Sequence, residues 1–149
     1  MIGLLRAENG ACAEWTFPAE LDAVRDARHA VHDTLRGWSL PPAVDELAVL
    51  LVSELVTNSL RHAYGPIGVR VAVRAPGPAG RSVRAVVTER AFLLVEISDP
   101  LPDPPTERPA GPEDEGGRGL SLVACSARRW GTRARRTGKT VWFELPLPG

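Results

Sequence analysis

The chain has 149 residues, of which 44% are hydrophobic, so it is long enough for one globular domain with its own buried core. Lysine plus arginine equals aspartate plus glutamate at 18 each, so no overall field attracts nucleic acid or an anionic membrane. Two cysteines, Cys12 and Cys125, are too few for a disulfide framework or a zinc site. No apolar run has the length of a signal peptide or a membrane span, and we therefore expect a cytoplasmic protein.

The first half of the chain alternates between strand and helix patterns. Apolar and polar residues alternate in the predicted strands, and apolar residues recur at intervals of three and four residues in the predicted helices. The second helix opens at a proline pair, which suits a first turn because the missing N–H has no helical partner there. The predicted elements are a strand over 11–17, a helix over about 21–35, a helix from Pro41 to about Tyr64, and a strand over 67–74.

The second half contains more strands and one unusual connection. Strands are predicted at 83–88, 92–98, 130–135 and 140–145, the last two forming a terminal hairpin. The segment from Pro100 to Gly117 carries six prolines, three glycines and five acids, so it cannot pack a core. Long connections of this kind are lids, binding loops or disordered insertions. We expect a lid over about 100–118, because a glycine-rich exit leads straight into a helix.

That exit is Gly116-Gly117-Arg118-Gly119, followed by an apolar segment that begins at Leu120. The sequence predicts a flexible glycine loop before a helix that starts near Leu120. Free N–H groups at such a helix start can hold phosphate. Alone, this pattern is a weak sign of a nucleotide site.

A stronger sign lies in the second predicted helix, where Glu54, Asn58 and His62 follow one another at intervals of four. Residues four apart share one face of a helix. An acid, an amide and an imidazole therefore form a polar stripe on an otherwise apolar segment. The stripe either lines a site or lies at the rim of the core, hydrogen-bonded to backbone or water.

Three segments in this order resemble the boxes of the Bergerat-type (GHKL) ATP-binding superfamily, and most closely its anti-sigma factor serine kinases. The segments are ELVTNSLRHA at 54–63, VEISDP at 95–100 and GGRGLSLV at 116–123, with GKTVWFEL at 138–145 similar to the closing strand. The resemblance covers about 12–146. It implies an α/β two-layer sandwich, with helices on one face of a mixed, mostly antiparallel sheet, as a single domain over 1–149.

The resemblance also implies roles for individual residues. Asn58 would ligate Mg²⁺, Glu54 would be the catalytic base, and Asp99 would read the amino group of adenine. In the third box, Gly117 and Gly119 would give backbone donors and lid mobility, and Arg118 would touch phosphate, with Leu120 next in the box. His62 is interpreted either as a structural hydrogen-bonding residue or as a contact to the nucleotide.

The function implied is that of an ATP- and Mg²⁺-dependent serine/threonine kinase that binds a sigma factor and phosphorylates its anti-anti-sigma antagonist, with a homodimer as a further expectation. The alternative is an ATP-responsive adaptor without kinase turnover. The reason for this alternative is that Leu101 and Asp103 occupy positions where the family normally has glycines. A domain that no longer binds ATP, and a histidine autokinase, are weaker alternatives.

A local run of arginines between Arg128 and Arg136 raises the question of nucleic-acid binding. The chain has no surrounding excess of positive charge and no interleaved aromatic residues for base stacking. We therefore expect this run to face solvent or a protein partner, and we expect no direct contact with nucleic acid.

Overall fold

The computed structural model describes residues 2–7, 10–62, 65–74, 91–100 and 115–148. The predicted strand at 83–88, Leu101, Asp103 and most of the predicted lid lie outside these residues. The described elements, in chain order, are β1 (Ile2–Ala7), β2 (Gly10–Phe17), α1 (Asp22–Gly37), α2 (Pro42–His62), β3 (Ile67–Arg74), β4 (Phe92–Asp99), α4 (Glu115–Ser126), β5 (Arg129–Arg135) and β6 (Gly138–Pro146).

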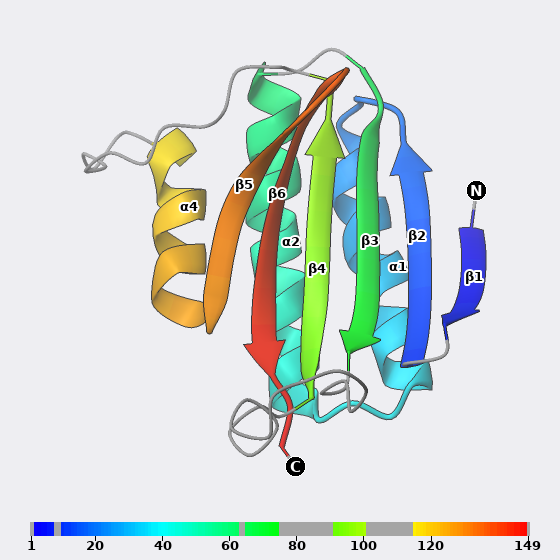
Figure 1. The fold of residues 1–149 in the computed structure, drawn as a ribbon. Coiled ribbons are helices and arrows are strands. Elements are labelled where there is room, and N and C mark those ends of the chain that lie inside the picture. Colours follow the sequence, from blue (N-terminus) through cyan, green and yellow to red (C-terminus); the bar gives the residue numbers. More distant parts are fainter. Residues whose placement is uncertain (1, 8–9, 63–64, 75–90, 101–114, 149) are drawn as a thin grey trace.

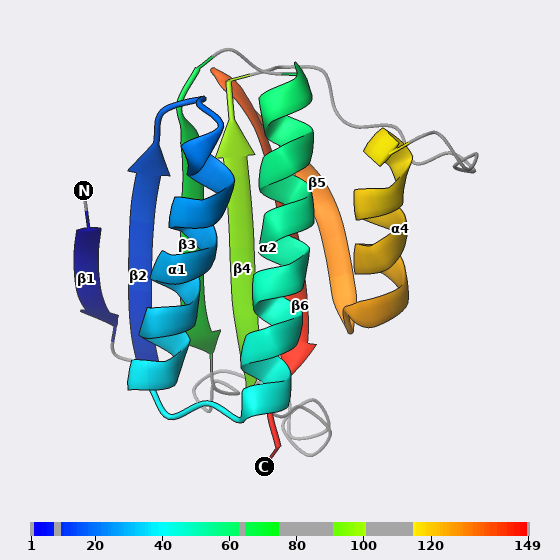
Figure 2. The same cartoon turned by 180° about the vertical axis from the view of Figure 1, so that it is seen from behind.

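The strands form one sheet in the order β1-β2-β3-β4-β6-β5, and all five strand pairings that the structure describes are antiparallel. The helices α1, α2 and α4 lie on one face of this sheet, side by side in the order α1, α2, α4 from the side of β2 to the edge strand β5 (Figures 1 and 2). The expected two-layer α/β sandwich, with helices on one face, is therefore confirmed.

The helices form where the apolar spacing predicts them. In α1, the buried residues Ala23, Ala27, Val31 and Leu35 recur every four residues and give the helix one apolar stripe toward the sheet. The second helix begins at Pro42, as the proline pair predicts. Neither helix, nor α4, is long and apolar enough to cross a membrane.

The strands alternate between the two faces of the sheet. In β4, Leu93, Val95 and Ile97 are buried beneath the helices, and they stand opposite Leu145, Phe143 and Val141 of β6. Successive side chains of a strand point to opposite faces. Asp99 continues this odd-numbered row, whereas Glu96 and Ser98 belong to the face that the helices leave uncovered.

Two details differ from the predictions. The strand β1 was not predicted, and it pairs with β2 along the whole register from Ile2 opposite Trp15 to Ala7 opposite Gly10. The predicted flexible loop at 116–119 is wrong, because α4 already begins at Glu115 and includes these glycines. Once a helix is nucleated in an apolar segment, each further residue adds a hydrogen bond, which offsets the cost of about 1 kcal/mol for a helical glycine.

Candidate functional site

A buried carboxylate ends the strand β4 on the helix side of the sheet. The side chain of Asp99 is only 3% exposed. Ser59 lies in the last part of α2, and its hydroxyl donates a hydrogen bond of 2.9 Å to Oδ2 of Asp99. This bond joins the end of β4 to the helix that carries the polar stripe.

A lysine lies on the same carboxylate from the neighbouring strand. Lys139 of β6 is directly opposite Asp99 in the strand register. Its Nζ lies 2.9 Å from Oδ1 and 2.8 Å from Oδ2, and its side chain is only 9% exposed. Each charge compensates for the desolvation of the other, which buried ions require.

Two glycines allow the chain to come this close around Asp99. Gly138 begins β6 with φ +154°, and a Cβ there would overlap the carbonyl oxygen of Asp99. A Cβ on Gly65, after α2, would lie 2.7 Å from Cγ of Pro100. Both positions therefore need a residue without a side chain. The end of α2, the end of β4 and the start of β6 meet at one end of the molecule (Figure 1).

The polar stripe lies along the second half of α2. Glu54 and Asn58 are half-buried, between buried neighbours such as Leu55 and Ser59. His62 is the last residue of the helix. The structure thus places the predicted base and the predicted magnesium ligand one turn apart on the helix that contacts Asp99.

The third predicted box forms the start of α4, which packs against α2. Gly117 and Arg118 lie in its first turn, whose N–H groups have no partner within the helix. Gly119 follows, and the side chain of Leu120 is buried in the hydrophobic core. This part of the third box is thus a helix start with unpaired backbone N–H groups, and Leu120 contributes to packing.

Two residues of this site, Ser59 and Lys139, were not predicted from the sequence. Each carries a signal in its spacing. Ser59 lies four residues after Leu55 and so shares its buried face, and Lys139 shares a face of β6 with Val141. A polar residue on the same face as buried apolar residues indicates a buried hydrogen-bonding partner. For both Ser59 and Lys139 this partner is Asp99.

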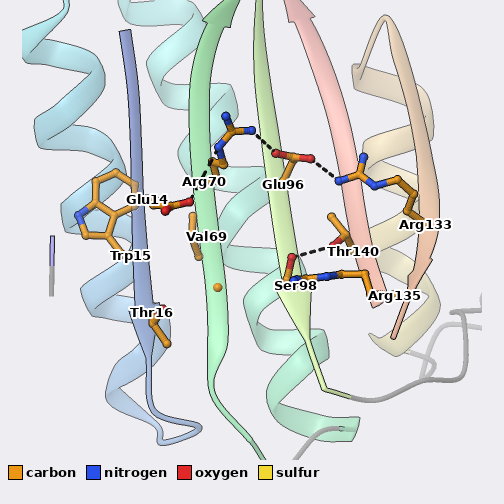
Figure 3. A pocket seen from close by; sticks show the side chains of 11 residues that line it. Glu14, Trp15, Thr16, Val69, Arg70, Glu96, Ser98, Arg133, Arg135 and Thr140 are labelled. Carbon is orange, nitrogen blue, oxygen red and sulfur yellow. Dashed lines mark hydrogen bonds and ion pairs between the residues drawn. The ribbon is translucent and has the colours of Figure 1, made fainter. Parts of the chain in front are cut away.

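A separate groove of about 580 Å³ lies on the sheet face that the helices leave uncovered (Figure 3). The hydroxyls of Ser98 and Thr140 are hydrogen-bonded there at 2.7 Å. Charged side chains from four strands surround them. The lining residues are Glu14, Trp15, Thr16, Gly68, Val69, Arg70, Glu96, Ser98, Arg133, Arg135 and Thr140.

The charges of this groove centre on Glu96. Its Oε1 accepts a hydrogen bond of 2.7 Å from Arg70, and its Oε2 accepts one of 2.5 Å from Arg133. Burial alone raises the pKa of Glu96, but the bonds from Arg133 and Arg70 outweigh burial, so that its pKa is lowered. The bond to Glu96 also raises the pKa of Arg70, against the effect of burial. This network therefore joins β3, β4 and β5 electrostatically.

Replacing Glu96 with glutamine should lower the free energy of unfolding at pH 7 by about 1–2 kcal/mol, because two charge-assisted hydrogen bonds weaken. Arg133 is 55% exposed, which limits the loss. Since the folded pKa of Glu96 lies below its ordinary 4.5, its stabilisation is present above that pH and is lost as the pH falls through the folded pKa.

Urea unfolding of both proteins between pH 3 and 7 measures this, and the difference between them should shrink toward pH 3. Glu14→Gln is the matched control, since Glu14 is more exposed and lies 3.9 Å from Arg70. A constant difference across this pH range would contradict the role of Glu96.

Comparisons with known proteins identify the fold. The crystal structure of the RsbU and RsbW domains of Rv1364c from Mycobacterium tuberculosis superposes with a TM-score of 0.64 at 16% identity, over 91% of this chain and 32% of that one. An uncharacterized protein of Streptomyces coelicolor is 39% identical over 65 residues, which is 42% of this chain and 62% of the relative. The chain thus spans about a third of the first protein and less than two thirds of the second.

The sequence profile of the histidine kinase-like ATPase domain matches residues 17–145. This range contains the helices α1, α2 and α4, the strands β3 to β6, and all three boxes that carry the resemblance. The family name implies ATP as the ligand. From its sequence and its fold together, the chain belongs to the family of histidine kinase-like ATPase domains.

Proposed function

We propose that this chain is an anti-sigma factor with Mg²⁺- and ATP-dependent protein serine/threonine kinase activity, directed at an anti-anti-sigma antagonist. The observation that carries the proposal is the buried carboxylate of Asp99, which Ser59 ties to the helix that holds Glu54 and Asn58. The structural neighbour with an RsbW domain supports the same class of regulator.

In this proposal, Asp99 accepts a hydrogen bond from the amino group of the base. A carboxylate accepts at both oxygens, and an exocyclic amine is a donor, so the two are complementary. Lys139 compensates the charge of this carboxylate. Orientation by Ser59 and Lys139 lowers the reorganisation that binding requires.

The triphosphate then extends from the base toward the start of α4. The unpaired N–H groups and the positive end of the helix dipole favour an anion there. Glycines at 116, 117 and 119 let phosphate approach the backbone closely. Arg118, a positively charged residue, belongs to the same turn of the helix.

The residues present also fit a magnesium ion that arrives with ATP. The described residues contain no group of three or more acids, histidines or cysteines that would hold a metal by themselves. Mg²⁺ needs few protein ligands, because phosphate oxygens and water complete its octahedron. The amide oxygen of Asn58 suits this ion, and the metal would neutralise charge on the phosphates.

In this proposal, Glu54 performs the proton transfer. It lies one turn before Asn58 on a half-buried part of α2, beside the proposed metal ligand. We assign it the role of a base that takes the proton from a substrate serine as the serine oxygen bonds to the γ-phosphorus and ADP leaves. The products are a phosphoserine protein and ADP, so no further reactant is needed.

Calorimetric titration with ATP, with and without Mg²⁺, tests the nucleotide site. Wild-type protein should bind ATP saturably, and Asp99→Asn should bind at least tenfold more weakly, because an amide presents only one acceptor and adds donors that oppose the amine. Thr140→Val, on the opposite face of the sheet, is the control and should bind like wild type. Equal affinity of Asp99→Asn and wild type would refute the assignment of Asp99.

Phosphate transfer separates the kinase from the adaptor alternative that Leu101 and Asp103 suggest. Radiolabelled γ-phosphate should move from ATP to serine of a purified anti-anti-sigma protein. Binding of ATP that changes the affinity for this protein without a phosphoprotein would instead favour an ATP-responsive adaptor.

A further inference from the structure

The ammonium of Lys139 has hydrogen-bonding capacity beyond its ion pair with Asp99. A lysine ammonium carries three N–H donors. Two of them are directed to the two oxygens of Asp99, at 2.9 and 2.8 Å. Among the residues that the structure describes, no other side chain accepts from this nitrogen, which leaves one donor for a ligand.

The backbone holds this donor directly beside the carboxylate acceptor. Lys139 and Asp99 are directly paired across β6 and β4, so their side chains emerge from the same face. Both side chains are more than nine-tenths buried. Gly138, packed on the carbonyl of Asp99, fixes the approach of the two strands at this point. This end of the sheet therefore presents a carboxylate acceptor and an ammonium donor side by side.

Such a pair complements two kinds of purine. Adenine presents an amino donor at position 6 beside the acceptor N1, whereas a 6-oxopurine presents the acceptor O6 beside the donor N1–H. A carboxylate alone accepts from adenine but repels O6. A carboxylate with an adjacent ammonium can satisfy both edges. With adenine, the carboxylate accepts from the amino group and the ammonium donates to N1. With a 6-oxopurine, the carboxylate accepts from N1–H and the ammonium donates to O6.

We infer that Lys139 reads the nucleobase together with Asp99, and that the site takes 6-oxopurine nucleoside triphosphates as well as ATP. This inference rests on the proposed nucleotide site at Asp99 and defines its substrate class. Lys139 is then the residue that sets base preference. Without its donor, the site would select adenine.

The test is calorimetric titration of the full chain with ATP and with inosine triphosphate, both with Mg²⁺. In wild type the two dissociation constants should agree within about tenfold. In Lys139→Met, the preference for ATP over inosine triphosphate should rise by about 100-fold, because O6 would face a carboxylate without a donor. Thr140 follows Lys139 in β6, but its side chain lies on the opposite face of the sheet. Thr140→Val should therefore keep the wild-type ratio of the two dissociation constants.

A second variant covers the case in which Lys139→Met leaves Asp99 too poorly compensated to fold, which its circular dichroism and melting curve would reveal. Lys139→Thr keeps one hydroxyl donor, which Asp99 occupies, and leaves none for O6. It should show the same rise in preference for ATP. The ratio of two affinities within one variant is insensitive to a general loss of stability.

Wild type that binds ATP but binds inosine triphosphate more than 100-fold more weakly would overturn the inference. An unchanged ratio in a folded Lys139 variant would do the same. Either result leaves the proposed function intact, whereas a wild-type protein that binds neither nucleotide refutes the proposed function and the inference with it.

Discussion

Replacing Glu54 with glutamine should leave ATP binding within about twofold of wild type and reduce phosphate transfer by about 10²- to 10⁴-fold, the usual contribution of a general base. Glutamine has nearly the same shape as glutamate but cannot take a proton at neutral pH. Because Glu54 is half-buried on α2 without a place in the core, the substitution should not disturb the fold. The measurement is the initial rate of transfer to an anti-anti-sigma protein at saturating ATP.

The matched control is Glu46→Gln, an exposed acid on the same helix that lies two turns earlier. It makes the same chemical change at a distance from the proposed site, so its transfer rate should equal that of wild type. Undiminished transfer in the Glu54 variant would show that another group takes the proton.

Replacing Asn58 with alanine should remove most of the gain in ATP affinity that Mg²⁺ provides, which we expect to be about 10- to 100-fold. The amide oxygen would be the protein ligand of an ion that otherwise keeps phosphate and water around it. Binding of ATP in the absence of Mg²⁺ should change little, since Asp99 and α4 are unaffected. Titrations at several Mg²⁺ concentrations measure both quantities.

Thr57→Val is the control for this variant, because Thr57 is the preceding residue and its hydroxyl donates a hydrogen bond of 2.7 Å to the backbone carbonyl of Ser53 in the same helix. Its titration curves should match those of wild type at every Mg²⁺ concentration. If the Asn58 variant keeps its full response to Mg²⁺, the ion is held by other groups.

Much of the fold followed from local patterns. The bounds of α1 and of the strands β2, β3 and β4 agree with the predictions within about two residues, because alternation and helical spacing record which face of each element is buried. The start of α4 was misplaced by five residues, since glycines reduce helix propensity only weakly against cooperative extension. The strand β1 was missed because its short segment gains its hydrogen bonds from β2 rather than from its own pattern.

The predicted site was likewise complete only in part. Glu54, Asn58 and His62 could be placed together from their spacing alone, because a helix fixes which residues share a face. Asp99 could be placed at the end of a strand. None of these patterns states which residues of other elements come near it.

The sequence by itself determined most of the secondary structure, because helices and strands depend on periods of a few residues. Its resemblance to the Bergerat-type superfamily supplied the α/β class and the candidates for metal ligand and base. Only the tertiary structure decided that Asp99 meets both Ser59 and Lys139, each 40 residues away along the chain. The pairing of β4 with β6 sets the contact with Lys139, and its register follows from the burial of an entire apolar face, whereas the packing of α2 on the sheet sets the contact with Ser59. A buried carboxylate must be compensated by whatever groups the packed elements bring to it, and the periodicity of one element contains no information about the next.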